Sequence, residues 1–501
     1  MRLKVIYRYI GLVLLFNAAF MVVGAAVSFF VGTGGTNGAA GIGAGAGTGT
    51  GVDTWALLGA AAIAAAIALV PVLTFPRDKD ISNKEGFSIV VGAWLASCVV
   101  GMLPYLLWDG LWGGPFDLSK AWYESVSGFT TTGSTIIGNV EAMPAGLLFW
   151  RSCTHWIGGA GVVMFAMLIM PLLGRSRMMV SHVEMSSLAR DDYKYTSTKI
   201  IRILLTVYLG LTGACCLLLK VAGMGWFDAV NHAMSTVATG GFSTRAMSLA
   251  SWDSAWIEGV TIFFMAVAGI HFGVIFSTLT GRRNNVFRSE VVRYWMFCLV
   301  AITLVVAASV TANGTYGFGE ALRFASFQTV STATTTGFVT ADANLWGPLS
   351  MVVLTMAGIQ CACAGSTSGG LKADRVWLAM KVLRHQIRQQ QHPNAVIRIK
   401  MNGVTQESSA LGFTILFMVA YFFLLGLGTV VFSVWGYDAV SAFSMTVSSL
   451  GNVGTGFGAA GGFSGADHLP AGLMWFSTLL MLLGRLEIFG LLQLFMIRWW
   501  R

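Results

Sequence analysis

Long runs of apolar residues, separated by short polar stretches, organise this 501-residue chain. Most of these runs are long enough to cross a membrane, because about 20 apolar residues in a helix span a hydrocarbon core of roughly 30 Å. The runs lie near residues 9–32, 54–75, 87–112, 146–173, 200–222, 254–280, 294–312, 347–364, 409–434 and 471–497. The pattern predicts an all-α polytopic membrane protein with ten spans. The first run is long enough to remain in the membrane rather than be removed as a signal peptide.

Composition and charge agree with this prediction. Charged residues make up 11% of the chain, whereas soluble proteins carry about 25%, which excludes a soluble enzyme and a disordered chain. The net charge is +9, but 25 of the 31 lysines and arginines lie at alternate ends of the spans. By the positive-inside rule, both termini are cytoplasmic. We therefore interpret the basic balance as a topology signal and expect no nucleic-acid partner.

Four segments between spans share one frame, A-x5-S-x3-[TN]-x-G, without a gap. They are too short and too rich in Thr, Ser and Gly to be transmembrane helices. The serines of the frame are Ser127, Ser235, Ser331 and Ser448, which lie 108, 96 and 117 residues apart. A frame repeated at this interval indicates a repeated structural unit.

Each predicted unit is a span, a short outer segment and a second span, so all four units have the same orientation. Parallel repeats of this kind pack around an axis along the membrane normal, which predicts a pseudo-fourfold ring with four re-entrant segments at its centre. In each segment we expect a short helix before the serine and an extended return, where glycine permits positive φ. The predicted divisions are two N-terminal helices in 1–85 and repeats in 86–195, 196–290, 291–405 and 406–501.

Rings of backbone carbonyls allow a cation to lose its water, and Thr-Thr-Thr-Gly is a composition that such filters use. With TTTG in the first and third segments and GNVG in the fourth, the chain resembles the superfamily of Trk, Ktr and HKT potassium transporters, in particular its bacterial TrkH/TrkG branch. The resemblance extends to CACAGSTSGGLK, RHQIRQQQHPNAVIRIK and MLLGRLEIF. In this family, glycine at all four filter positions accompanies potassium preference.

The resemblance implies that potassium, the transported ion, is bound in four short stretches. These are Thr130, Thr131, Thr132 and Gly133; Ala238, Thr239, Gly240 and Gly241; Thr334, Thr335, Thr336 and Gly337; and Gly451, Asn452, Val453 and Gly454. No organic cofactor is expected on this chain.

The resemblance also implies a gate below the filter. Segment 361–372 resembles the family's intramembrane loop, and Arg485 matches an arginine that projects into the pore and repels cations. The gate residues are Gly365, Ser366, Thr367, Ser368, Gly369, Gly370 and Arg485. The alternatives are a glycine kink without a gating role and a structural arginine bonded to carbonyls of the broken helix, since a guanidinium in a span must face protein or water.

Several polar residues have two interpretations. Glu124 and the outer-loop residues Asp117, Glu141, Asp253, Asp342 and Asp467 could form an acidic mouth that concentrates cations, or could be ordinary solvated carboxylates. His155 and His271 lie in spans as candidate proton relays, but we favour helix packing. A proton- or sodium-coupled potassium symporter on the same scaffold is therefore the alternative function, with His155, His271 and Glu487 as its candidate sites.

The resemblance implies partners as well. The basic segments 174–202 and 372–402 are expected to dock a cytosolic TrkA-type nucleotide-binding subunit, or to reflect positive-inside charge alone. We expect a homodimer in the lipid bilayer of a bacterial plasma membrane. The glycine-rich residues 33–51 are interpreted as a flexible linker. No HExxH motif, pair of intramembrane aspartates or Ser/Lys dyad indicates an enzyme.

Overall fold

The computed structural model describes residues 2–33, 51–76, 82–112, 116–172, 197–281, 285–392, 398–406, 408–461, 463 and 465–495. The fold is helical apart from one hairpin, in which β1 (Lys400–Met401) pairs antiparallel with β2 (Val404–Thr405). The linker predicted in 33–51 and the basic segment 174–202 lie almost wholly outside the described residues.

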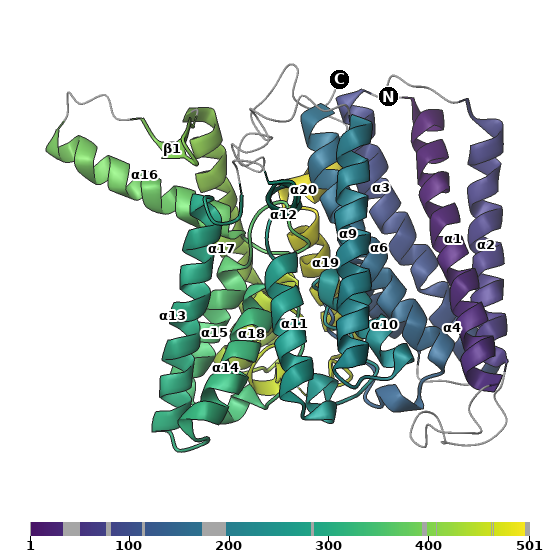
Figure 1. Cartoon of the computed structure of the whole chain (residues 1–501). Helices are drawn as coiled ribbons and strands as arrows, with labels where there is room; N and C mark the ends of the chain where they lie inside the picture. The colour runs from purple at the N-terminus through teal and green to yellow at the C-terminus, as the bar shows by residue number, and fades with distance from the viewer. Residues whose placement is uncertain are drawn as a thin grey trace.

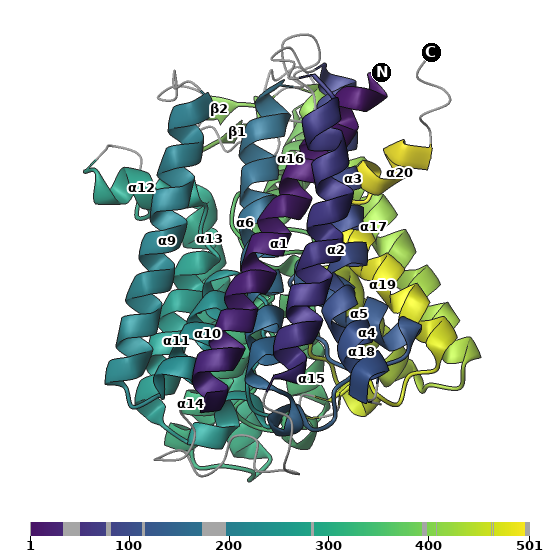
Figure 2. The ribbon, with the colours of Figure 1, turned by 90° about the vertical axis from the view of Figure 1, so that its right-hand side faces the viewer.

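Apolar helices, most of them long, form the body of the molecule (Figures 1 and 2). They are α1 (Leu3–Thr33), α2 (Val52–Thr74), α3 (Asn83–Gly101), α4 (Leu103–Trp112), α6 (Ala145–Leu172), α9 (Ser197–Val221), α11 (Ala255–Ala268), α12 (Phe272–Leu279), α13 (Glu290–Ala312), α15 (Pro348–Gln360), α17 (Ser408–Val434), α19 (Ala471–Arg485) and α20 (Phe489–Phe495). Among the described residues, six helices are long and apolar enough to cross a membrane, or seven if α11 and α12 count as one bent span. The prediction of an all-helical polytopic membrane protein is confirmed.

Four further helices lie among these, each of which contains a serine of the repeated frame: α5 (Leu118–Phe129), α10 (Trp226–Val237), α14 (Phe318–Ala333) and α18 (Ala439–Gly451). We call them the inner helices. They lie in the half of the molecule away from the N-terminus (Figures 1 and 2). Asp117 and Asp438 cap α5 and α18, because each carboxylate accepts a backbone N–H of the first turn. The short helix expected before each serine of the frame is confirmed, and each helix continues two or three residues beyond that serine.

The two N-terminal helices pack on this body through small residues. Ala56, Ala60, Ala64 and Ala68 of α2 are buried, and α1 is packed so closely against α2 that a Cβ on Gly11 would lie 2.8 Å from the carbonyl oxygen of Ala68. Close approach of this kind is how transmembrane helices associate where lipid offers no hydrophobic driving force. On another side, α1 contacts α3.

The predicted span 87–112 is interrupted at Met102, between α3 and α4, and three others bend sharply or leave the helix. The run 254–280 bends by 103° between α11 and α12, 347–364 ends as a helix at Gln360, and 471–497 breaks after Arg485. The breaks lie close together, so each supplies partners for the exposed backbone groups of another. The N–H of Cys363 donates to the carbonyl of Gly269 (3.0 Å), and the N–H of Phe272 donates to that of Gly365 (3.1 Å).

Two further elements lie at the end of the molecule where the N-terminus lies. Helix α16 (Ala373–Gln391) projects sideways there, near the β-hairpin (Figure 1). Short 3-10 turns complete the described fold: η1 (Val140–Ala142), η2 (Ser248–Trp252), η3 (Ala343–Trp346) and η4 (Gly458–Ala460).

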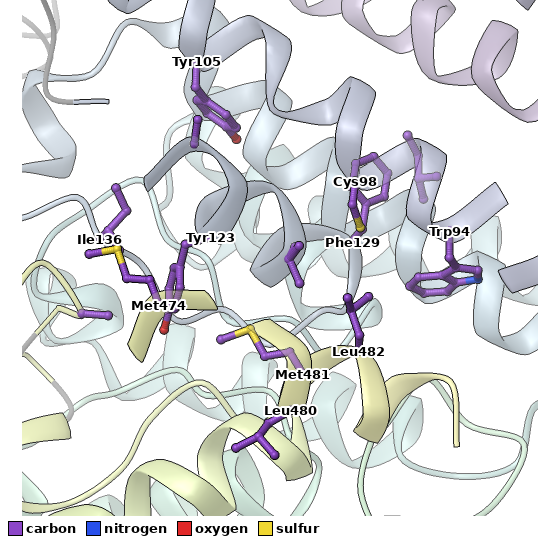
Figure 3. Close-up of a cluster of buried hydrophobic side chains, with 14 of the residues drawn as sticks. Trp94, Cys98, Tyr105, Tyr123, Phe129, Ile136, Met474, Leu480, Met481 and Leu482 are labelled. Carbon is purple, nitrogen blue, oxygen red and sulfur yellow. The ribbon is translucent and has the colours of Figure 1, made fainter. Parts of the chain in front are cut away.

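A large apolar cluster fixes α5 in place. Phe129 and Tyr123 of α5 pack between Trp94 and Cys98 of α3 on one side and methionines and leucines of α19 on the other (Figure 3). The labelled α19 residues are Met474, Leu480, Met481 and Leu482. Because packing at native density resists displacement, the cluster holds the end of α5 at a defined position in the interior.

Candidate functional site

Each inner helix leads directly into a short loop that ends in a glycine of the repeated frame. We call these the glycine loops; they span residues 130–133, 238–241, 334–337 and 451–454. The glycine of each loop lies against a carbonyl oxygen of the next loop, and the contacts close into a ring. The pairs are Gly133 with the carbonyl of Gly240, Gly241 with that of Thr336, Gly337 with that of Val453, and Gly454 with that of Thr132.

The four loops share one backbone conformation. The second residue of each has positive φ: 52° at Thr131, 53° at Thr239, 57° at Thr335 and 55° at Asn452. The third residue donates its N–H to the carbonyl of the frame serine at 2.8 or 2.9 Å, in the pairs Thr132–Ser127, Gly240–Ser235, Thr336–Ser331 and Val453–Ser448. A β-branched threonine with positive φ is strained, and strain of this kind is concentrated at functional sites. Asparagine tolerates the conformation better, which suits the fourth loop.

Only glycine fits the last position of each loop. The four glycines have φ between 79° and 86°, a region that L side chains rarely adopt. A Cβ at any of them would also overlap the carbonyl oxygen of the neighbouring loop. Both the backbone conformation and the lack of space therefore require glycine. A side chain at this position of one loop would displace a carbonyl of the next loop.

The inner helices direct their C-termini at the ring. Helices α5, α10, α14 and α18 end at Phe129, Val237, Ala333 and Gly451, immediately before or at the first residue of each loop. The C-terminal end of a helix carries a partial negative charge from its aligned peptide dipoles. Four such ends around one ring favour a cation at its centre.

Hydrogen bonds between polar side chains stabilise the loops. The hydroxyls of Thr130 and Thr132 are 2.8 Å apart, and those of Thr334 and Thr336 are 2.7 Å apart. Across the ring junction, the Asn452 amide donates to the hydroxyl of Thr132 (3.0 Å). These bonds use side chains to fix the backbone, which leaves the carbonyls as the groups available to an ion.

A cavity of about 550 Å³ adjoins the ring and is lined by its four glycines and by residues that follow them. Asp467 is among these lining residues, together with His468 and Arg245. The other predicted outer carboxylates have local partners: Asp117 and Asp342 cap helices, Glu141 accepts the N–H of Ala246, and Asp253 pairs with Arg323.

Neither interpretation of Glu124 is correct. Its carboxylate is fully buried and pairs with Arg151, with Glu124 Oε1 2.7 Å from Arg151 Nε. It is therefore neither a solvated loop carboxylate nor part of an open mouth.

Residues 361–372 form a buried loop at the opposite end of the glycine loops from the cavity. Gly369 donates its N–H to the hydroxyl of Thr335 (3.0 Å), which itself contacts the hydroxyl of Ser368 (3.2 Å). The hydroxyl of Thr367 donates to the carbonyl of Val237 at the end of α10 (3.0 Å). The loop therefore contacts the third glycine loop and the end of α10 that leads into the second, and Gly369 also lies against Gly451 and Asn452 of the fourth.

Arg485 reaches the same loop from the end of α19 rather than from the middle of a continuous span. It is 4% exposed, and its Nη1 donates to the carbonyl of Thr367 (2.8 Å). The hydrogen bond expected for a structural arginine is therefore present. The same contact also places the positive charge of Arg485 next to the loop, as the gating role requires.

The contacts of the two span histidines favour helix packing. His155 lies with Nδ1 3.0 Å from the hydroxyl of Ser235, and its ring stacks on Phe242. His271 caps α12, and its Nδ1 accepts the N–H of Gly273 (2.9 Å).

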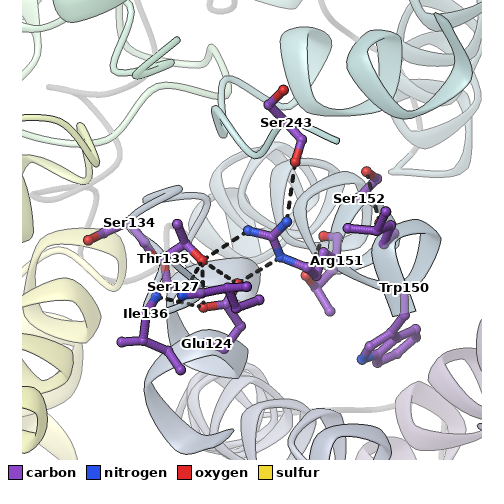
Figure 4. A network of polar contacts seen from close by, with 12 residues as sticks. Glu124, Ser127, Ser134, Thr135, Ile136, Trp150, Arg151, Ser152 and Ser243 are labelled. Carbon is purple, nitrogen blue, oxygen red and sulfur yellow. Dashed lines mark hydrogen bonds and ion pairs between the residues drawn. The ribbon is translucent and has the colours of Figure 1, made fainter. Parts of the chain in front are cut away.

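Sequence reasoning missed Arg151. Its guanidinium lies at the centre of a buried polar network that also contains Glu124, Thr135 and Ser243 (Figure 4). It falls within the predicted span 146–173 and lies on α6. The signal was available, because an ionisable residue inside an apolar span is by default a functional candidate.

Comparisons with known proteins agree on one family. Residues 59–499 match the family described as "TrkH: Cation transport protein". The Trk system potassium uptake protein TrkH of Halomonas elongata is 34% identical over 426 residues, which cover 84% of this chain and 87% of that protein. TrkH of Escherichia coli is 34% identical over 444 residues, covering 87% and 90%. The crystal structure of the potassium transporter TrkH from Vibrio parahaemolyticus superposes with a TM-score of 0.86 at 28% identity, covering 100% of both chains.

Proposed function

This chain belongs to the TrkH family of cation transport proteins, which are transporters and not enzymes, and we propose that it takes up potassium ions across a bacterial plasma membrane. The family membership confirms the resemblance inferred from the sequence. The relatives named above are potassium uptake proteins of bacteria, which supports potassium as the ion and a bacterial membrane as the location.

The observation that carries the proposal is the closed ring of glycine-to-carbonyl contacts among the four loops. The proposed mechanism is the exchange of the ion's water for backbone carbonyls of residues 130–133, 238–241, 334–337 and 451–454. A ring of fixed dimensions can distinguish cations, because the number and placement of the carbonyl dipoles determine how well they replace the water lost by each ion. The ends of the four inner helices contribute favourable potential to an ion in the ring.

Flux through the ring is proposed to follow the membrane potential, which supplies about 2.3 kcal/mol per elementary charge at about 100 mV. The gate proposed for this flux is the buried loop 361–372 together with Arg485. Support comes from the contacts of the loop with Thr335 and Val237 and from its hydrogen bond to Arg485. Its position directly next to the glycine loops is suited to closing the path of an ion.

We also propose a domain organisation, a topology and partners for this chain. We propose the division into two N-terminal helices and four parallel repeats with the boundaries given above, both termini cytoplasmic, a homodimer, and regulation by a TrkA-type cytosolic subunit. The similar backbone of the four loops and the packing of α1 and α2 at the edge of the body support the division.

A direct experiment is flux from purified protein in liposomes, combined with growth of a bacterial host that lacks its own potassium uptake systems. We expect restored growth at low potassium and a reversal potential that follows the K+ gradient alone. A reversal potential that shifts with an imposed Na+ or pH gradient would instead support the coupled symporter. Absence of K+ flux from folded protein would overturn the proposal.

A further inference from the structure

Arg151 of α6 is buried, with 1% of the residue exposed, and each nitrogen of its guanidinium donates a hydrogen bond. Nε donates to Glu124 Oε1 (2.7 Å), Nη1 to the carbonyl of Ser243 (3.2 Å) and Nη2 to the hydroxyl of Thr135 (3.1 Å) (Figure 4). The guanidinium carbon also lies 4.1 Å from the centre of the Phe242 ring. A planar, rigid fork with five donors is what allows one side chain to hold three acceptors in fixed directions.

The acceptors occupy matching positions in two different loops. Thr135 lies two residues after Gly133, and Ser243 lies two residues after Gly241. Arg151 therefore connects equivalent points just after the first and second glycine loops. Glu124 extends the connection to the helix that precedes the first loop, because its carboxylate also accepts the N–H of Ile136 (3.2 Å).

Next to the glycine loops, the other described junctions use neutral hydrogen bonds; the ion pairs of Arg323 also join the second and third repeats, but at the start of α14, away from the loops. Val339, two residues after Gly337, donates its N–H to the hydroxyl of Ser248 (3.2 Å). The N–H of Gly458 donates to the side-chain oxygen of Asn344 (2.9 Å), and the N–H of Ala466 donates to the carbonyl of Thr135 (2.7 Å). The first junction thus depends on a buried charge, whose partners are tightly coupled since removal of one leaves the other charge unpaired.

We propose that Arg151 is a positioning residue for ion selectivity, setting the distance between the first and second glycine loops. The inference rests on the proposed potassium function. At this junction the Gly240 carbonyl lies against Gly133, so a change in spacing moves a carbonyl of the ring itself. A looser ring lets the carbonyls close around a smaller cation, which lowers discrimination against sodium.

The test compares K+/Na+ permeability ratios, from reversal potentials, for purified wild-type and variant protein in liposomes. Arg151→Lys keeps the charge and loses the three-way fork. We expect folded protein with a ratio lowered about tenfold. Arg323→Lys is the matched control: Arg323 pairs with Glu258 and Asp253, bridges α11 and α14 away from the glycine loops, and is expected to leave the ratio unchanged.

Thr135→Val provides a second variant that keeps the Arg151–Glu124 pair and removes one acceptor of the fork. Its ratio should fall in the same direction by a smaller factor, and this variant decides the question if Arg151→Lys does not fold. An unchanged ratio in the folded variant, or an equal fall in Arg323→Lys, would overturn the inference. A wild-type protein that does not select potassium would instead overturn the proposed function, so the two failures are distinguishable.

Discussion

The guanidinium of Arg485 donates a hydrogen bond to the carbonyl oxygen of Thr367, 2.8 Å away, in the buried interior. The hydroxyl of Thr367 in turn donates to the carbonyl of Val237, the last residue of inner helix α10. Two successive hydrogen bonds therefore connect Arg485, through Thr367 of the buried loop, to the helix that leads into the second glycine loop. Two roles of Arg485, electrostatic repulsion and support of the loop, act on the same atoms and can be separated only by variants that remove one and keep the other.

The ring glycines should be intolerant of any side chain. In Gly133→Ser, the new Cβ overlaps the Gly240 carbonyl, and the backbone is held at φ 79°, so the neighbouring carbonyl must move. We expect a lower K+/Na+ permeability ratio, measured from reversal potentials. Gly210→Ser on α9 is the control, because a Cβ there meets no other heavy atom within 4 Å. A variant Gly133→Ser with the wild-type ratio would show that the ring is not the filter.

Deletion of residues 365–370 should increase flux. These residues are buried between the glycine loops and Arg485, so their removal opens the path at that level if the loop is a gate. The measurement is K+ flux per folded molecule, with folding checked by size-exclusion profile and thermal unfolding. Flux at or below the wild-type level from well-folded deletion protein would reject the gate.

An ion pair next to the loop should contribute strongly to stability. Arg375 lies three residues beyond loop 361–372, and its Nη2 is 2.9 Å from Glu487 Oε2, with the two side chains 2% and 18% exposed. Glu487→Gln removes the carboxylate from a buried guanidinium that also lies 3.9 Å from the Phe417 ring. We expect a loss of about 3–5 kcal/mol, the range for breaking one side of a buried pair. The measurement is thermal or denaturant unfolding in detergent.

A double variant, Arg375→Met with Glu487→Leu, is the companion to that experiment. Replacing both charges with apolar side chains should recover part of the lost stability, because the guanidinium and the carboxylate are then removed together. The single variants Arg375→Met and Glu487→Leu complete the cycle. If the loss of stability in the double variant equals the sum of the two single losses, the residues are not coupled and the assignment of a stabilising pair is wrong.

Period and composition predicted the helical class and the positions of the four glycine loops, since a frame of Ala, Ser, Thr or Asn and Gly survives without a gap. They did not predict the breaks at 269–271 and 486–488, because both lie inside long, mainly apolar runs and hydropathy does not register where the backbone leaves the helix. The positive φ of Thr131 and its counterparts was also unpredictable from residue type, since threonine disfavours it. The role of Glu124 was not predicted, because its pairing with Arg151 joins residues 27 apart on different helices.

The last prediction separates the two roles of Arg485. A buried positive charge repels a potassium ion by about 2 kcal/mol at roughly 8 Å with an effective dielectric constant of about 20. That energy slows permeation more than about tenfold, since each ~1.4 kcal/mol is a factor of ten. Arg485→Ala should therefore raise flux per folded molecule and leave the K+/Na+ ratio unchanged, because the ring glycines lie beyond it. Arg485→Lys keeps the charge but not the fork of donors, so it should retain most of the block. Equal flux in the two variants, at or below the wild-type level, would refute the electrostatic role and leave Arg485 as a support for the carbonyl of Thr367.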